Sequence, residues 1–118
     1  MHELYVDFMS QPSRALILLC RLNGLVDAGK VKECLVMIHK RQQRTEEYKR
    51  LNPLQQVPCL VERNENTQEV SFRLPESCAI LKYLCQTFQL PDKWYPSEQS
   101  TLGTKARLEQ QVRINERT

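Results

Sequence analysis

The sequence lacks a long hydrophobic run, and its longest uninterrupted apolar stretch spans only residues 15–20. A helix that crosses a membrane needs about 20 consecutive apolar residues, so we expect no membrane span. The first residues, Met-His-Glu-Leu-Tyr-Val, contain neither a basic segment nor an apolar one. We therefore expect no secretory signal peptide.

A strong excess of charge is also missing. The 17 Lys and Arg residues stand against 14 Asp and Glu residues, a net charge of +3. This excess is weaker than the electrostatic footprint of a nucleic-acid-binding protein, so we expect no nucleic-acid partner. The one basic cluster, residues 40–50, fits a solvated helix surface better than an anion-recognising edge, although the second interpretation stays open.

The five cysteines include no C-x-x-C pair, and their number is odd. No histidines lie near them at the spacing of metal ligands, so we expect no metal site. Free, buried thiols in a reducing compartment are the favoured interpretation, which places the chain in the cytoplasm. A redox pair or a zinc site remains the alternative.

The pattern of apolar and turn-forming residues predicts one domain of alternating elements, followed by a polar helix. We expect the helix over 13–22 to be well buried and to end at Asn23-Gly24, with Gly24 in the left-handed conformation. The nearly all-apolar strand over 34–38 should be buried on both faces. The predicted strands are 4–8, 34–38, 57–62 and 69–74, and the predicted helices are 13–22, 45–50, 76–88 and 104–116.

The order of these elements through residue 88 is β-α-β-α-β-β-α. A strand-helix-strand unit favours parallel pairing, and the short link between the third and fourth strands favours an antiparallel hairpin. A proline opens the third strand. The sequence therefore predicts an α/β fold of the thioredoxin-like type.

The segment Ser10-Gln11-Pro12-Ser13 lies between the first strand and the first helix. Thioredoxin-like redox proteins carry C-x-x-C here, because a helix N-terminus lowers the pKa of a thiol. Serines at both cysteine positions exclude disulfide exchange by this segment. A serine hydroxyl could instead donate a hydrogen bond to a bound thiolate, while plain helix capping is the simpler interpretation.

Two further dipeptides are candidates for binding. If the bond between Val57 and Pro58 is cis, the backbone of Val57 turns outward and offers its N–H and C=O groups to an extended ligand. An ordinary proline at the start of a strand is the alternative.

Glu76 and Ser77 precede a predicted helix. Glu76 could take an ammonium group, and Ser77 together with its N–H could receive a carboxylate, so the pair suits an amino-acid head group, with helix capping as the alternative.

Together, these segments resemble the N-terminal domain of a theta-class glutathione transferase. The resemblance extends over about residues 1–96, and its matching segments occur in the family's order. They are Leu4–Asp7, Met9–Ala15, Lys40–Gln43, Asn52–Leu54, Val57-Pro58, Glu76–Leu84 and Trp94–Pro96.

The resemblance implies roles for individual residues. Ser10 would be the catalytic serine that stabilises the glutathione thiolate, with Ser13 as the second candidate. Val57 would pair with the cysteinyl backbone of glutathione. The other implied glutathione-binding residues are Gln11, Gln43, Gln56, Pro58, Glu76 and Ser77.

Within this set, Glu76 and Ser77 would hold the γ-glutamyl end, and Gln43 would lie near the glycyl carboxylate. Gln56 stands where many family members carry a lysine for that carboxylate. Arg41 or Arg44 could compensate for the missing charge.

The resemblance also implies the domain organisation and the activity. Residues 1–90 would form the glutathione-binding domain, and residues 91–118 a linker and the first helix of an all-helical second domain. The expected activity is conjugation of glutathione, as co-substrate without a further cofactor, to a small electrophile by a homodimer. The alternatives are a non-catalytic glutathione-transferase-like binding module and a fragment of a gene model or a splice form that folds but has no independent role.

Overall fold

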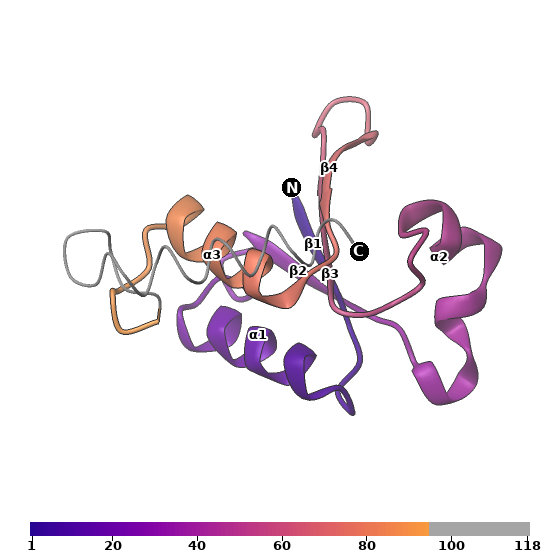
Figure 1. Cartoon of the computed structure of the whole chain (residues 1–118). Helices are drawn as coiled ribbons and strands as arrows, with labels where there is room; N and C mark the ends of the chain where they lie inside the picture. Colours follow the sequence, from indigo (N-terminus) through magenta and orange to yellow (C-terminus); the bar gives the residue numbers. More distant parts are fainter. Residues whose placement is uncertain (95–118) are drawn as a thin grey trace.

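Four strands form one mixed sheet in the order β2-β1-β3-β4 in the computed structural model, which describes residues 1–94 (Figure 1). The strands are β1 (His2–Val6), β2 (Val31–Leu35), β3 (Cys59–Arg63) and β4 (Val70–Leu74). β1 pairs with β2 in parallel, and β3 is antiparallel to both β1 and β4. The predicted thioredoxin-like order is confirmed. The helix predicted over 104–116 lies outside the described residues.

Three helices flank this sheet: α1 (Gln11–Leu22), α2 (Glu46–Leu51) and α3 (Ser77–Thr87). Figure 1 shows α1 and α3 together on one side of the sheet and α2 on the other. Two short 3-10 turns, η1 (Ile38–Lys40) and η2 (Gln42–Arg44), connect β2 to α2. No helix within residues 1–94 combines the length and the hydropathy that crossing a membrane requires.

Helix α1 ends where its local signals predict but begins at Gln11, two residues before the predicted start. The Ser10 side chain accepts a hydrogen bond from the N–H of Ser13, and Gly24 follows the helix at φ 72°, a conformation that suits glycine. The prediction that α1 is well buried is correct for one side of the helix only. Leu18 is 56% exposed and Leu22 68% exposed, because only one side of α1 faces the sheet and α3.

The second strand differs from its prediction. It spans Val31–Leu35 rather than 34–38, and it is an edge strand in which Val31 is buried while the other residues are half-buried or exposed, rather than a strand buried on both faces. The N–H of Val36 still donates to the Val6 carbonyl at 2.8 Å, and the chain leaves the sheet after it, where side chains accept the N–H groups. Gln42 Oε1 accepts from Met37 N at 2.8 Å, and Asp7 Oδ2 accepts from Ile38 N at 3.1 Å.

The first strand is also shifted, from 4–8 to His2–Val6. Asp7 no longer pairs in the sheet, because its N–H donates to the Oγ of Ser13 and its carboxylate accepts from Met9 N. The turn that follows begins two residues earlier than predicted and leads directly into the cap of α1.

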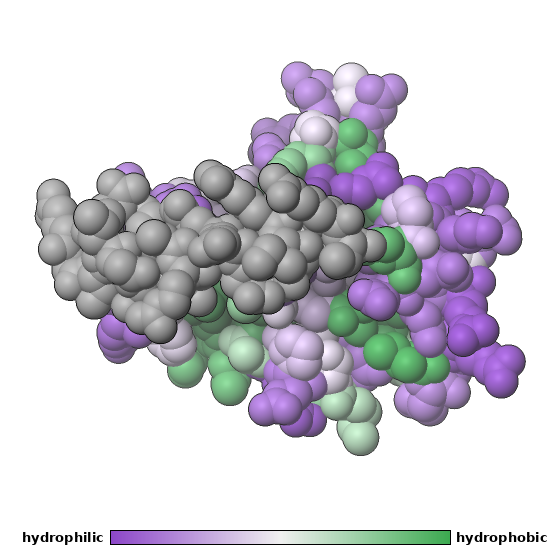
Figure 2. Space-filling model, in the orientation of Figure 1, coloured by the Kyte–Doolittle hydropathy of each residue, from purple (hydrophilic) through white to green (hydrophobic). Residues whose placement is uncertain are grey.

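The hydrophobic core lies between the sheet and the pair α1 and α3. Leu4 and Val6 of β1 and Leu60 of β3 contribute fully buried side chains from the sheet. Leu16, Ile17, Leu19, Cys20, Ile80, Leu84 and Cys85 contribute the helical part of this cluster. Removing these side chains from water is the main source of stability for the unit. Figure 2 shows the opposite character around α2, where the surface is mostly hydrophilic.

Candidate functional site

The sheet brings the predicted site residues to one of its ends. β1 and β2 end side by side there. β3 begins there, because its first residue Cys59 pairs with Tyr5, and β4 ends there by its antiparallel pairing with β3. The segments next to these strand ends carry Ser10, Gln11, Gln43, Gln56, Val57, Pro58, Glu76 and Ser77.

Ser10 is the N-cap of α1, in extended backbone conformation, and is half-buried. Its Oγ accepts from Ser13 N at 3.4 Å, and its own N–H donates to the Asp7 carbonyl at 2.9 Å. Within residues 1–94 its hydroxyl proton has no acceptor. Ser10 therefore combines a free O–H donor with the positive end of a 12-residue helix, where a negative charge is favoured.

Ser13, the second candidate for the thiolate-stabilising hydroxyl, is fully buried. Its Oγ accepts from Asp7 N at 3.4 Å and so ties α1 to the end of β1. A bound ligand would have to displace packed atoms to reach this oxygen, so the geometry favours Ser10 over Ser13.

Asp7 belongs to the site's support, and the sequence analysis does not predict it. It is 4% exposed, and its two carboxylate oxygens accept from Met9 N at 3.0 Å and Ile38 N at 3.1 Å. Asp7 thus joins the turn that carries Ser10 to η1. An acidic residue directly after a buried strand is the signal that could have identified it.

Val57 precedes Pro58 through a cis peptide bond, the state that the resemblance implies. β3 begins only at Cys59, so Val57 lies before the sheet. The N–H and C=O groups of Val57 have no hydrogen-bond partner within the described part of the chain. They are free to pair with an extended ligand, which is the arrangement that the sequence analysis considered.

The segment before Val57 is fixed by two side chains that the sequence analysis does not identify. The carbonyl of Gln56 accepts from the hydroxyl of Tyr48 at 2.6 Å and from Asn52 Nδ2 at 2.9 Å. Asn52 is 1% exposed, and its Oδ1 also accepts from Leu54 N at 3.2 Å. These contacts hold the backbone that leads into Val57, and hydrophobic periodicity gives no signal for such side-chain-to-backbone hydrogen bonds.

A pocket of about 370 Å³ lies between η2 and residues 54–56. Gln43 and Arg44 line one side, and Gln55 and Gln56 the other. The side-chain oxygen of Gln43 is buried and has no partner within residues 1–94. Arg44 supplies the positive charge of this lining, which makes the pocket suitable for a carboxylate.

Glu76 and Ser77 form the start of α3. Glu76 is the N-cap, and its Oε2 accepts from Ala79 N at 2.9 Å, so the capping interpretation is confirmed for this oxygen. The N–H of Ser77 has no acceptor within residues 1–94. The pair therefore still offers a carboxylate and a free N–H side by side, as binding of an amino-acid head group requires.

The thiols of the protein are all free, as predicted, although only Cys20, Cys59 and Cys85 are buried while Cys34 and Cys78 are half-buried. Burial raises the pKa of Cys20 to about 12 and that of Cys59 to about 11. Burial, followed by the charge of Glu76, also raises the pKa of Cys78, the thiol nearest the start of α3 in sequence. These shifts disfavour a protein thiolate as the nucleophile. Within residues 1–94, no group of three His, Cys, Asp or Glu residues is placed to hold a metal ion.

Residues 10–86 match the family described as "Glutathione S-transferase, N-terminal domain". The chain is 39% identical to mouse glutathione S-transferase theta-3 over 92% of its own length and 39% of the mouse protein. It is 41% identical to glutathione S-transferase T1 of Arabidopsis thaliana over 83% of its length and 36% of that protein. The chain thus spans about two fifths of the length of these curated relatives.

Solved structures give the same result. The apo form of a variant of human glutathione S-transferase T1-1 superposes with a TM-score of 0.72 at 32% identity, covering 97% of this chain and 42% of the human one. Human glutathione transferase theta-2, in complex with glutathione, superposes with a TM-score of 0.68 at 36% identity, covering 82% of this chain and 35% of the human one.

Proposed function

Because the chain belongs to the glutathione S-transferase family and carries the N-terminal domain of a theta-class member, we propose that it binds glutathione and activates its thiol for transfer to an electrophile. The complex of human theta-2 with glutathione supports the binding step. Glutathione is the co-substrate in this proposal, and no further cofactor takes part.

In the proposed mechanism, Ser10 donates its hydroxyl hydrogen to the sulfur of glutathione. Together with the N-terminus of α1, this hydrogen bond stabilises the thiolate and lowers the pKa of the thiol, so more nucleophile exists at neutral pH. The thiolate attacks an electrophilic carbon, forming a C–S bond while the leaving group departs with its electron pair. The thiol proton goes to solvent.

The remaining site residues position the tripeptide. The free N–H and C=O of Val57, beside Pro58, pair with the cysteinyl backbone. The carboxylate of Glu76 holds the γ-glutamyl ammonium, and the hydroxyl and N–H of Ser77 hold the γ-glutamyl carboxylate. Gln43 and Gln56, in the pocket that Arg44 also lines, receive the glycyl end, and Gln11 lies beside Ser10 at the start of α1.

The observation that carries the proposal is the position of Ser10. Its hydroxyl has no acceptor within residues 1–94, and it lies at the same end of the sheet as the free backbone groups of Val57 and Ser77. The buried position of Ser13 supports Ser10 as the thiolate partner.

The wider assignment follows the family and belongs to the same proposal. Residues 1–90 form the glutathione-binding domain, and residues 91–118 form the linker and first helix of an all-helical domain. The protein acts as a cytoplasmic homodimer on a small electrophile.

Calorimetric titration with glutathione tests the binding step. We expect saturable binding by the wild-type chain and a loss of affinity in Ser77→Ala, while Ser71→Ala, an exposed serine on β4, serves as the control. Binding without conjugation of a chlorinated aromatic would favour the non-catalytic module. No binding by the folded wild-type chain would refute the proposed function.

A further inference from the structure

A second pocket, of about 350 Å³, lies on the face of the sheet that α2 covers. Its lining includes Tyr5, Leu35, Glu47, Tyr48, Leu51 and Arg63. It shares no residue with the proposed glutathione site, and its volume falls at the lower end of the range for small-molecule pockets, about 300–1,000 Å³.

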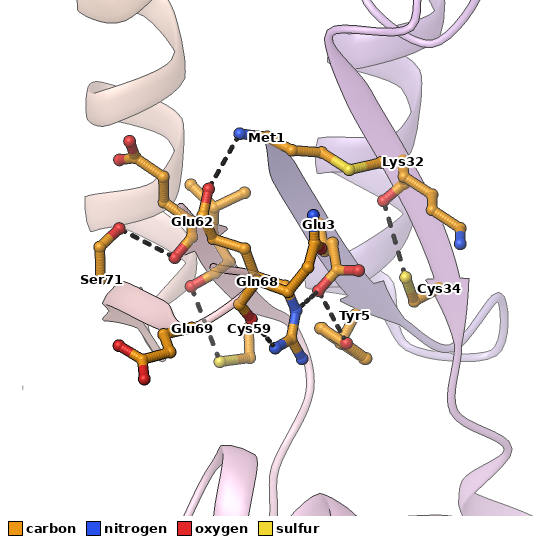
Figure 3. A network of polar contacts seen from close by, with 12 residues as sticks. Met1, Glu3, Tyr5, Lys32, Cys34, Cys59, Glu62, Gln68, Glu69 and Ser71 are labelled. Carbon is orange, nitrogen blue, oxygen red and sulfur yellow. Dashed lines mark hydrogen bonds and ion pairs between the residues drawn. The ribbon is translucent and has the colours of Figure 1, made fainter. Parts of the chain in front are cut away.

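The pocket exists because α2 is short. Its 6 residues cover only part of this face of the sheet. Beyond it, the face is covered by polar contacts rather than by a helix, and Figure 3 shows Glu3, Tyr5 and Cys34 pointing into that polar region from β1 and β2. The opening between α2 and this polar region is where the pocket lies.

Two aromatic rings and two aliphatic side chains form the apolar walls. The rings of Tyr5 and Tyr48 lie 5.8 Å apart at 54°. Tyr48 is 4% exposed, and its hydroxyl is committed to the Gln56 carbonyl, so its ring is held in place. Leu35 and Leu51 add flexible apolar surface. A planar ring that fills such a space gains both burial and favourable tilted aromatic contacts.

Arg63 supplies hydrogen-bond donors at one end of the pocket. Its Nε donates to Glu3 Oε1 at 2.6 Å and one terminal nitrogen to the Gln68 carbonyl at 3.0 Å. The Tyr5 hydroxyl donates to the same Glu3 oxygen at 3.0 Å. A guanidinium carries five N–H groups, so donors remain for an acceptor on a ligand.

The charges around the pocket disfavour a charged ligand. Glu3 compensates Arg63, and Glu47 on α2 adds a negative charge to the lining. An anion gains little attraction here because Arg63 is already paired with Glu3, and a cation gains little because the Glu47 carboxylate is exposed to solvent. An uncharged ligand is favoured over both, because desolvating an ion without a matched partner is costly.

We propose that the pocket between α2 and the sheet binds an uncharged aromatic molecule of one or two rings that carries a hydrogen-bond acceptor. The ring packs against Tyr5, Tyr48 and Leu35, and the acceptor receives a hydrogen bond from Arg63. This site is separate from the proposed glutathione site and does not depend on glutathione binding.

A nuclear magnetic resonance titration of the 15N-labelled chain with 2-naphthol, which is uncharged at neutral pH, tests the proposal. We expect saturable shifts of the amide signals of Leu35, Tyr48 and Leu51, with a dissociation constant in roughly the millimolar range for a ligand of this size. Naphthalene-2-carboxylate and 2-naphthylmethylammonium carry the same rings with either charge, and both should bind at least about fivefold more weakly.

Two variants locate the site. Leu35→Trp, at an edge-strand residue that is 42% exposed, fills the pocket and should weaken 2-naphthol binding at least about tenfold. Leu22→Trp places the same new ring on α1, away from the pocket lining, and should leave binding unchanged. Absence of saturable shifts, stronger binding of a charged analogue, or equal binding by Leu35→Trp would each overturn the proposal.

Discussion

The buried carboxylate of Asp7 should make a large contribution to stability, and Asp7→Asn measures it. The variant preserves the shape of the side chain but replaces one oxygen by an NH₂ group. Met9 N and Ile38 N both donate to this carboxylate, at 3.0 Å and 3.1 Å. In the variant, one of these N–H groups faces the NH₂ group, which is itself a donor, and loses its acceptor. The other N–H group keeps an oxygen acceptor, but that oxygen is uncharged.

The expected loss of stability follows from these two contacts. A hydrogen bond to a charged group contributes about 1.5–3 kcal/mol, and a buried N–H without an acceptor costs about 1–3 kcal/mol. Both donors are only partly buried, which favours the lower part of these ranges. We expect Asp7→Asn to lower the free energy of unfolding by about 2–3 kcal/mol.

Urea denaturation followed by circular dichroism provides the assay. With a denaturant dependence of about 1–3 kcal/mol per molar urea, the midpoint should fall by roughly 0.7–3 M. Asp27→Asn, at an exposed loop carboxylate, is the control and should change stability by less than about 0.5 kcal/mol. Equal midpoints for Asp7→Asn and wild type would show that the carboxylate does not hold the turn.

Three further changes test other parts of the structure. Burial, partly offset by the charge of Glu62, lowers the pKa of His2 below 6.5. The unfolded chain therefore binds more protons than the folded one, and the free energy of unfolding should fall as the pH drops through 6.5. Unfolding measured from pH 8 to pH 4 should show a smaller fall in His2→Gln than in the wild type. Asn52→Ala leaves the N–H of Leu54 without its acceptor and should lower the free energy of unfolding by about 2–4 kcal/mol, measured by thermal unfolding. A loss below about 0.5 kcal/mol would contradict the role of Asn52 in holding this segment. Leu19→Ala, at a side chain that is 1% exposed, should lower the free energy of unfolding by about 2–5 kcal/mol. Leu18→Ala, at a side chain that is 56% exposed, should lower it by less than about 1 kcal/mol. Equal losses in the two variants would contradict the described burial of α1.

The elements defined by local signals were predictable from the sequence. Ser10 and Thr45 accept from backbone N–H groups of their own helices, and Gly24 ends α1, so each boundary depends on residues a few positions away. The β3–β4 hairpin likewise follows from alternation and a short polar turn, and its antiparallel pairing is confirmed. The thioredoxin-like order and the family follow from these elements together with the ordered motifs.

The second strand was not predictable in this way. Its apolar residues suggest a buried strand over 34–38, but its end is set by Asp7 from β1's end and by Gln42 from η2. The contact with Asp7 is tertiary, because Asp7 is 31 residues away from its partner Ile38, whereas Gln42 lies 5 residues from its partner Met37. Hydrophobic periodicity carries no information about such contacts, which also explains why the anchors of Gln56 were not identified.

The candidate site was predictable as a set of residues but not in its supports. Ser10, Val57 and Ser77 were identified by motif and resemblance, and their placement at one end of the sheet follows from strand order. Their roles toward glutathione stay predictions. The preference for Ser10 over Ser13 required the structure, because both serines flank the same short turn and differ mainly in burial.

The central claim is that the Ser10 hydroxyl stabilises the thiolate of bound glutathione. The most direct test is the ultraviolet absorbance of the bound thiolate, titrated against pH in the wild-type chain and in Ser10→Ala, with Ser71→Ala as the matched control. We predict that the bound thiol has a pKa below that of free glutathione in the wild type and in Ser71→Ala, and that the pKa rises toward the free value in Ser10→Ala. An unchanged thiol pKa in Ser10→Ala, with glutathione still bound, would contradict the claim.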